Sequence, residues 1–353
     1  MNFDHENERF GVLNDCRKQG ILLDVARVFY TSIRRNGENN MNEVNYIEVK
    51  NRIKNYLRIL VTDACNLQCV YCHKEGRHTG LNAQSVDQNE NFDLRAVLQI
   101  AKDTGISKVK ISGGEPLLFP NIIEICEEFQ DAFSDIGFTT NGLELMNLKK
   151  QLSDSQKKKL TFNVTLNCLD DAKYTAITCS NKSPHDVISG IDLLLKLGYK
   201  VKINSVITSF NFDDIHELVT FAAIRKIDIK LLDLFSVDGT PGNFQRISIA
   251  EIKNKIMELY RLNNDEFFME NDYLCANVLG IKVMLPQRVY SIDCQYNCPM
   301  YPCAEGLFGI RVYEDYSCSQ CFKAGELHIG ALGELKNNIE AIRRTIENTR
   351  MVF

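Results

Sequence analysis

The sequence lacks the features that would direct a chain into or across a membrane. Its first twenty residues show no basic stretch followed by an apolar one, so they do not resemble a secretion signal. No apolar run approaches ~20 residues, the length that a membrane-spanning helix needs. These absences predict a cytoplasmic protein without a membrane partner, in a compartment where thiols stay reduced.

Excess positive charge is also absent. The formal net charge is −5, with 25% charged residues, whereas a general nucleic-acid-binding protein would be basic. The composition therefore predicts no nucleic-acid partner, although a few placed cations could still hold a small anion. Low-complexity segments and short-period repeats are missing too. The hydrophobic content of 44% is enough for a sizeable core.

Cysteine, by contrast, is abundant, with 13 residues. One cluster contains Cys65, Cys69 and Cys72, and a second contains Cys294, Cys298, Cys303, Cys318 and Cys321. Clustered thiols in a reducing compartment indicate metal or iron–sulfur ligation rather than disulfides. The other cysteines are scattered, and we expect most of them to be small buried residues: Cys16, Cys126, Cys168, Cys179 and Cys275.

Strand-like and helix-like segments alternate along the middle of the chain. Strands are expected at 56–63, 108–114, 136–142, 160–167, 200–208 and 229–235, and helices at 92–105, 121–132, 184–198 and 212–226. Such alternation predicts an α/β fold with a parallel sheet and crossover helices, and about six units suit an open or partial barrel. We expect a polar N-terminal extension over 1–50, the barrel over 51–245 and a C-terminal region over 246–353.

Four of these strands carry polar residues on one face. A parallel strand that is covered on both sides should be almost entirely apolar. Half-solvated edge strands would explain one such face, but a polar-lined lumen is the better interpretation for four. A lumen that contains arginine and lysine predicts an anionic ligand. The polar faces contain Arg58 and Thr62; Lys108, Lys110 and Ser112; Asn163, Thr165 and Asn167; and Lys202 and Asn204.

The first cysteine cluster follows a strand, so it lies at the edge where barrel-like folds build active sites. Iron–sulfur cubanes usually take four thiolates. Three ligands leave one iron without a protein donor, and an open coordination position is typical of catalysis. A structural zinc ion is the alternative, but it would need a fourth donor, and His73 adjoins Cys72 in an awkward position.

The C-x3-C-x2-C spacing, with Tyr71 before the last cysteine, resembles the signature of the radical S-adenosylmethionine (SAM) superfamily. About 40 residues later, "SGGEPLL" (112–118) resembles the superfamily's glycine-rich strand end, where backbone groups hold the methionine part of SAM. Gly113 and Gly114 allow the backbone to approach a ligand more closely than a side chain would permit.

A narrower resemblance extends over roughly residues 56–240. The segments "LRILVTDACNLQCVYCHKEG", "ISGGEPLL", "FTTNG", "FNVTLNCLDDAKYTAIT" and "VKINSVI" are similar, in order and spacing, to the GTP 3′,8-cyclase family of molybdenum-cofactor synthesis. The resemblance implies a partial (β/α)6 TIM-like barrel with a small cysteine-rich C-terminal domain. It also implies bound SAM and a [4Fe-4S] cluster on Cys65, Cys69 and Cys72.

The same resemblance assigns further residues. It places Tyr71, Gly114 and Thr165 at SAM-contact positions, and Arg58, Lys110, Thr139 and Lys202 where the family holds its nucleotide triphosphate. We expect Glu115 and Asn141 to orient the amino and ribose groups of SAM, with a helix cap or a turn residue as the alternative. The implied chemistry is reductive cleavage of SAM by an electron from a donor such as flavodoxin or ferredoxin. The resulting 5′-deoxyadenosyl radical takes hydrogen from a small nucleotide-like substrate, which then cyclises or rearranges.

The C-terminal cysteines depart from the family pattern. The family holds a second cluster through C-x2-C and a later cysteine, with which Cys321 in "IRVYEDYSCSQCF" aligns. Upstream, "CQYNCPMYPCAEG" replaces the C-x2-C, so five cysteines could ligate a second [4Fe-4S] cluster fully and give it an electron-transfer or structural role. The family's Gly-Gly tail is replaced by "NTRMVF". Both departures predict a substrate other than GTP.

Two alternatives remain open from the sequence. A radical SAM peptide maturase also carries C-terminal clusters, but it should have a peptide-binding domain before the barrel, and residues 1–50 look too short and polar for one. An iron–sulfur scaffold or redox sensor would need neither the "GGEP" strand end nor the polar lumen.

Overall fold

The computed structural model describes residues 41–73, 92–154, 159–235, 242–298, 301–303, 305–321 and 330–352. Most of the predicted N-terminal extension lies outside these residues, and its last part belongs to helix α2 (Met41–Lys54). Residues 50–353 form one compact unit. Within the described ranges, no helix is both long enough and apolar enough to cross a membrane.

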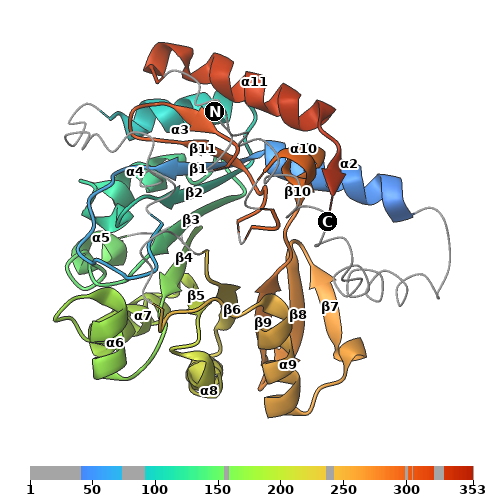
Figure 1. Cartoon of the computed structure of the whole chain (residues 1–353). Helices are drawn as coiled ribbons and strands as arrows, with labels where there is room; N and C mark the ends of the chain where they lie inside the picture. Colours follow the sequence, from blue (N-terminus) through green and yellow to red (C-terminus); the bar gives the residue numbers. More distant parts are fainter. Residues whose placement is uncertain are drawn as a thin grey trace, which may run out of the picture. The chain divides into compact units, whose positions relative to one another are not determined.

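A single sheet organises this unit, and its six central strands are parallel (Figure 1). They are β1 (Tyr56–Leu60), β2 (Lys108–Ser112), β3 (Asp135–Thr140), β4 (Leu160–Thr165), β5 (Lys200–Ile207) and β6 (Asp228–Asp233). Each pairs in parallel with the next strand in the chain. This is the arrangement of a partial (β/α)6 barrel, so the predicted fold class is confirmed.

Helices connect the parallel strands and bury one apolar face each. They are α3 (Leu94–Asp103), α4 (Ile122–Phe129), α5 (Lys149–Asp154), α6 (Asp171–Thr178), α7 (Pro184–Lys196) and α8 (Ile215–Ile224), with the short 3-10 turns η2 (Pro116–Leu118) and η3 (Phe212–Asp214). Local signals set where they begin. Asp93 accepts a hydrogen bond from the Ala96 amide at 3.0 Å, and Ser183 and Asp186 form a capping box at the start of α7.

The C-terminal region extends both edges of the same sheet. After α9 (Ile249–Tyr260) and η4 (Asn264–Glu266), β9 (Ile281–Pro286) pairs in parallel with β6 and in antiparallel with β8 (Tyr273–Val278), which pairs with β7 (Phe267–Glu270). At the other edge, β11 (Ile310–Val312) pairs in parallel with β1, and β12 (Cys318–Ser319) follows it. The predicted boundary at 245/246 falls just before α9, and the division into domains stays a prediction.

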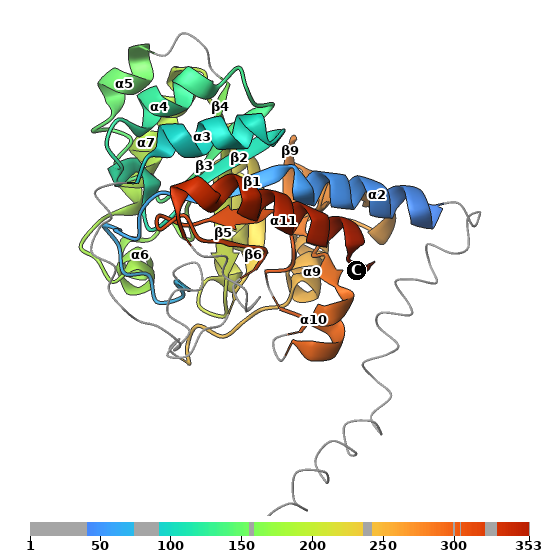
Figure 2. The same ribbon diagram turned by 90° about the horizontal axis from the view of Figure 1, so that it is seen from above.

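The remaining elements lie around this region. They are β10 (Tyr290–Ser291), α10 (Ile292–Asn297), η5 (Leu332–Glu334), α11 (Leu335–Asn348) and β13 (Met351–Val352), which pairs with β10. Helix α11 lies beside α3, which in turn lies beside α4 (Figure 2). The last helix of the chain therefore covers the first crossover helix of the barrel.

The strands alternate between a buried and a half-buried face. In β5, Val201, Ile203 and Ile207 are buried, whereas Lys202 and Asn204 are half-buried. The register aligns Arg58 with Lys110, Asn163 with Lys202 and Asn204 with Lys230 across neighbouring strands. One face of the sheet is thus the core beneath the helices, and the other is lined by amides and cations.

Candidate active site

The cysteine loop, residues 61–73, directly follows β1. Cys65 and Cys72 are exposed, and Cys69 is half-buried. Burial raises the pKa of Cys69 to about 12, and the nearby thiols of Cys72 and Cys65 add to this rise. The loop is fixed to the end of α6, because the Gln68 and Val70 amides donate to the carbonyl oxygens of Thr178 and Ile177 at 3.0 and 2.9 Å. The three thiols therefore lie on one loop at the carboxyl edge of the sheet, and their role as cluster ligands stays a prediction.

Gly113 and Gly114 support this loop from β2. The Gly114 amide donates to the Thr62 carbonyl oxygen at 2.7 Å. A Cβ on Gly114 would lie 2.2 Å from the Ala64 carbonyl oxygen, and one on Gly113, whose φ is 141°, would lie 2.3 Å from that of Thr62. We expected the glycines to let a ligand approach. The described contacts show that they also admit the backbone of residues 62–64, immediately before Cys65.

Glu115 follows the two glycines and is buried. Its carboxylate accepts hydrogen bonds from the Leu117 amide at 3.0 Å, the Thr140 hydroxyl at 2.7 Å and the Asn141 amide at 2.7 Å. It is therefore the N-cap of η2, which was the alternative interpretation, and it joins β2 to the end of β3. Its role toward SAM stays a prediction. Burial outweighs these donors and raises the pKa of Glu115 to about 7.

The raised pKa of Glu115 predicts a pH dependence of folding. Because the carboxyl is more basic in the folded chain, its contribution to stability is fully present below about pH 4.5 and is lost as the pH rises through about 7. We expect the free energy of unfolding of the wild type, relative to Glu115→Gln, to fall by roughly 1–3 kcal/mol between pH 5 and pH 8. Urea denaturation of both proteins across this range measures the difference. Parallel pH profiles would contradict the expectation.

Asn141 connects the end of β3 to the cysteine loop. Its Nδ2 donates to Asn66 Oδ1 at 2.7 Å and lies 3.9 Å from Cys65 Sγ. Asn66 in turn donates to Glu144 Oε1 at 3.0 Å. The side chain thus holds the first cysteine in position, which the sequence did not show. A contact with the ribose of SAM is untested and stays a prediction.

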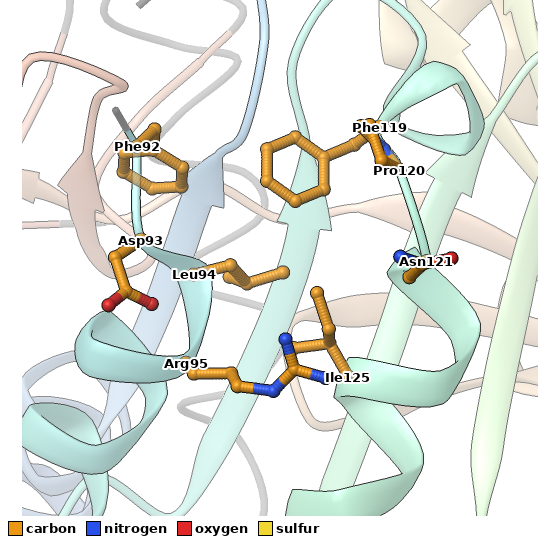
Figure 3. Close-up of a pocket in the computed structure, with 8 residues that line it drawn as sticks. All are labelled: Phe92, Asp93, Leu94, Arg95, Phe119, Pro120, Asn121 and Ile125. Atoms are coloured by element: carbon orange, nitrogen blue, oxygen red, sulfur yellow. The ribbon is translucent and has the colours of Figure 1, made fainter. Parts of the chain in front are cut away.

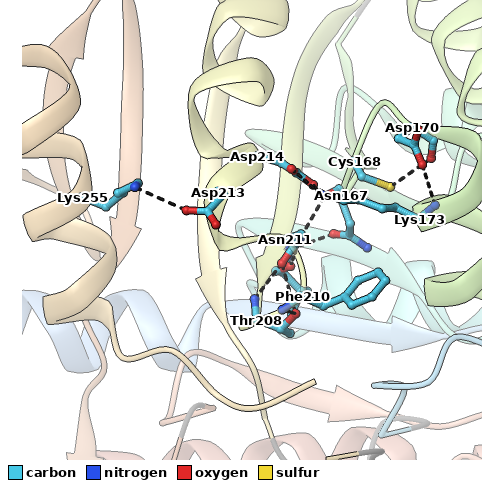
Figure 4. Close-up of polar contacts among 11 residues, drawn as sticks. Asn167, Cys168, Asp170, Lys173, Thr208, Phe210, Asn211, Asp213, Asp214 and Lys255 are labelled. Atoms are coloured by element: carbon cyan, nitrogen blue, oxygen red, sulfur yellow. Dashed lines mark hydrogen bonds and ion pairs between the residues drawn. The ribbon is translucent and has the colours of Figure 1, made fainter. Parts of the chain in front are cut away.

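Tyr71 and Asn167 connect the loop to the ends of β4 and β5. The Tyr71 hydroxyl bonds to Cys69 and lowers the pKa of that thiol, opposing the effect of burial. Asn167 Nδ2 donates to the same hydroxyl at 2.6 Å, and Asn211 Nδ2 donates to the Asn167 carbonyl oxygen at 2.8 Å (Figure 4). Thr165, a predicted SAM contact, ends β4 and is half-buried. A series of hydrogen bonds through Asn211, Asn167 and Tyr71 therefore connects the turn after β5 to Cys69, the second cysteine.

Four cations interact on the inner face of the sheet: Arg58, Lys110, Lys202 and Lys230. Burial lowers the pKa of Lys110 well below its usual value, and the charge of Lys230 lowers it further. The same two causes, in the same order, lower the pKa of Lys202. Thr139, the fourth residue assigned to the nucleotide triphosphate, is half-buried on β3, in register with Asn163.

Lys230 was missed by the sequence analysis. Its Nζ donates to Asn163 Oδ1 at 2.9 Å and lies 5.0 Å from the centre of the Tyr273 ring. The signal was available, because Lys230 interrupts the apolar run "IKLLDLF" with the same alternation that marked the other strands. Partly buried groups of like charge that lower each other's pKa values are typical of a site built for an anion.

The C-terminal cysteines differ in exposure. Cys294, Cys298, Cys303 and Cys321 are partly exposed, whereas Cys318 is buried on β12. Among the scattered cysteines, Cys126, Cys168 and Cys275 are buried, as expected. Cys179 is the exception among the described ones, and it is exposed because it caps the C-terminus of α6 with φ 49°. Cys16 lies outside the described residues.

A separate surface pocket of about 320 Å³ lies between the N-terminal ends of α3 and α4 (Figure 3). It is lined by Phe92, Asp93, Leu94, Arg95, Phe119, Pro120, Asn121 and Ile125. None of the predicted site residues lines it, so it is distinct from the cysteine loop and from the cations.

Comparison with known families defines the class of this protein. The pattern described as "Radical SAM superfamily" matches residues 59–222, which run from β1 to α8 and include the cysteine loop and the two glycines. Relatives that are more than 30% identical extend the match over about three quarters of their own length. The chain belongs to the radical SAM superfamily.

Within this superfamily, the chain is similar to proteins named as cyclases. It is 35% identical over 179 residues to the "Probable GTP 3',8-cyclase" of Pyrococcus abyssi, which is 50% of this chain and 56% of that protein. It is 32% identical over 233 residues to the "Probable GTP 3',8-cyclase" of Methanopyrus kandleri, which is 65% of this chain and 73% of that protein. The chain thus spans little more than half the length of the Pyrococcus relative. The resemblance to this family is confirmed.

A solved structure shares the fold. Streptococcus suis SuiB bound to S-adenosylmethionine superimposes with a TM-score of 0.59 at 20% identity, over 85% of this chain and 70% of that one. At this identity the likeness concerns the fold, and it includes much of the C-terminal region.

The superfamily implies a [4Fe-4S] cluster and SAM, and the cysteine loop fits the cluster. No three His, Cys, Asp or Glu side chains in the described part of the chain converge on one metal ion. A cubane does not require this, because each cysteine binds a different iron atom at a different corner. A tetrahedral zinc ion would require convergence. The donor set of three thiols on one fixed loop, two exposed and one half-buried, therefore suits a cluster with one open iron.

Proposed function

We propose that this protein is a radical SAM enzyme that acts on a small, phosphorylated, nucleotide-like substrate. One observation carries the proposal. The four cations lie on the six parallel strands, and the cysteine loop follows the first of these strands. Arg58 lies within β1, and the three thiols lie beyond its carboxyl end. A reactive group held at the edge of the sheet can thus meet a ligand whose anionic end lies deeper.

The residues divide this work. The cluster and SAM, when bound, supply a 5′-deoxyadenosyl radical that takes a hydrogen atom from the substrate. Cys65, Cys69 and Cys72 would hold three iron atoms, and Tyr71, Gly114 and Thr165 would contact SAM. The cations Arg58, Lys110, Lys202 and Lys230 would bind the phosphate. Burial is the main cause of the lowered pKa values of Lys110 and Lys202, and an anion would offset the repulsion between the cations that adds to it.

We assign a second [4Fe-4S] cluster to the C-terminal cysteines. Burial supports one ligand set among the five. The thiol of Cys318 on β12 is buried and lies 3.7 Å from the Tyr316 carbonyl oxygen. The four partly exposed cysteines are therefore the ligands that we propose: Cys294, Cys298, Cys303 and Cys321. Four protein thiolates would leave no open iron, which favours electron transfer or a structural role.

The substrate class follows from these departures. The relatives are named for GTP, but the altered C-terminal cysteines would change the end of the site that faces the base. Flavodoxin or ferredoxin is the class of donor that we propose for the electron. The peptide-maturase alternative depends on a peptide-binding domain before the barrel, and residues 1–40 lie outside the described residues.

An anaerobic assay tests the proposal. The full-length protein is reconstituted with iron and sulfide, reduced with dithionite and given SAM alone, SAM with GTP or SAM with GMP. We expect a nucleotide-dependent increase of at least several-fold in 5′-deoxyadenosine, counted by mass spectrometry. Equal, slow cleavage in all three mixtures would exclude both nucleotides as substrates. No cleavage by protein with a full iron load would contradict the role of the cysteine loop.

A further inference from the structure

The carboxylate of Glu305 contacts two arginines, Arg58 and Arg311, beside the proposed anion site. Glu305 pairs closely with Arg311 and lies 4.0 Å from Arg58. The three side chains are well covered, with exposed fractions of 13% for Glu305, 0% for Arg311 and 17% for Arg58. An ion group of this kind, enclosed by protein, is screened by salt much less than a surface pair.

The backbone fixes the two arginines side by side. Arg58 on β1 and Arg311 on β11 occupy directly paired positions of parallel strands. The Phe308 ring lies under both guanidinium groups, 4.5 Å from Arg58 and 4.8 Å from Arg311. A second bond, from Arg311 to the Gln320 carbonyl oxygen at 2.7 Å, holds the buried arginine. Glu305 therefore meets a preformed fork of two guanidinium groups, the geometry that also suits a phosphate.

Glu305 lowers the net positive charge around the proposed anion site. Arg58, Arg311, Lys110, Lys202 and Lys230 contribute positive charge, whereas Glu305, Asp135 and Asp228 contribute negative charge. Asp135 acts on Lys110, and Asp228 lies 4.0 Å from Lys202. This group therefore has an excess of at most about two positive charges, because the lowered pKa values of Lys110 and Lys202 reduce their charge. A phosphate monoester carries about −1.5 to −2 near neutral pH, and a triphosphate carries roughly twice as much.

We propose that Glu305 is a specificity-determining residue that fits the site to a ligand with one phosphate group and disfavours a triphosphate. This inference rests on the proposed function, because it concerns the anion of the same substrate. Glu305 offsets the charge of the two arginines beside the lysines, and it repels additional phosphates. The remaining lysines bind the single phosphate.

Binding measurements on the full-length, reconstituted protein test this inference. Guanosine, GMP and GTP are titrated by calorimetry into the wild type and into Glu305→Gln, which keeps the shape of the side chain and removes its charge. We expect the wild type to bind GMP at least as tightly as GTP, and guanosine more weakly. In Glu305→Gln we expect about tenfold tighter binding of GTP, with GMP changed by less than about threefold. Circular dichroism monitors the fold of each variant.

A matched control and the wild type keep the test decisive. Glu128→Gln breaks another arginine pair, with Arg95, on the outer surface, and should leave all three affinities unchanged. A wild type that binds GTP at least tenfold more tightly than GMP would overturn the inference, even if Glu305→Gln does not fold. An unchanged ratio of GTP affinity to GMP affinity in Glu305→Gln would overturn it as well. Guanosine binding as tightly as both nucleotides would instead reject the phosphate site of the proposed function.

Discussion

Replacing Gly114 with alanine should detach the cysteine loop from β2 and reduce the binding of iron. The new methyl group would lie 2.2 Å from the Ala64 carbonyl oxygen and 2.5 Å from that of Asp63, so backbone rather than a flexible side chain has to move. We expect Gly114→Ala to lower the free energy of unfolding by about 3 kcal/mol. We also expect it to lose most of the iron that the wild type retains after anaerobic reconstitution. Urea denaturation and iron analysis measure the two effects.

Gly242→Ala is the matched control for this prediction. Gly242 has nothing within 4 Å of its Cβ position, so alanine should fit there without strain. We expect its stability to remain within about 0.5 kcal/mol of the wild type. Retention of full iron content and stability by Gly114→Ala would show that residues 62–64 move freely away from β2, contrary to the tight contact described.

Replacing Lys110 with methionine should weaken ligand binding and stabilise the fold. The ammonium is buried among like charges, so its removal should raise the free energy of unfolding by about 1–2 kcal/mol. Under the proposed function, GMP should bind at least about tenfold more weakly to Lys110→Met. Because the pKa of Lys110 is lower in the folded chain, the unfolded chain binds more protons between the two pKa values. Wild-type stability should therefore rise with pH there, and the variant should lack this rise.

Lys108→Met serves as the control. The alternating pattern placed Lys108 on the same polar face as Lys110, but the structure leaves Lys108 exposed at the beginning of β2. Its replacement should therefore change neither GMP binding nor the pH dependence. The combination of higher stability with lower affinity distinguishes a binding role from a structural one. A variant that is destabilised and yet binds GMP normally would contradict the placement of Lys110 in an anion site.

The fold could be predicted because its signals are local. Helices α3 and α7 have apolar periodicity and local caps at Asp93 and Ser183, and several strands have an alternating pattern. The cysteine loop is local as well, since its three ligands lie within eight residues. These features require no knowledge of what packs against them.

The features that escaped prediction depend on contacts between distant segments. Arg311 lies in a strand of three residues, too short for a periodic pattern, and its meaning comes from pairing with Arg58. Glu305 lies in a cysteine-rich loop without periodicity. Gly114 was only partly explained by the sequence. The sequence indicated that a side chain is excluded there, and only the structure shows that Ala64 lies against this glycine.

The pairing of β11 with β1 also has a consequence for how the chain matures. Leu57 and Ile310 are partners in one ladder, although about 250 residues separate them. Translation proceeds at roughly 5–20 residues per second, so the strand that leads into the cysteine loop keeps an open edge for on the order of 10–50 s while the rest of the chain is made. A chain truncated before residue 310 should therefore present an unpaired strand that invites aggregation.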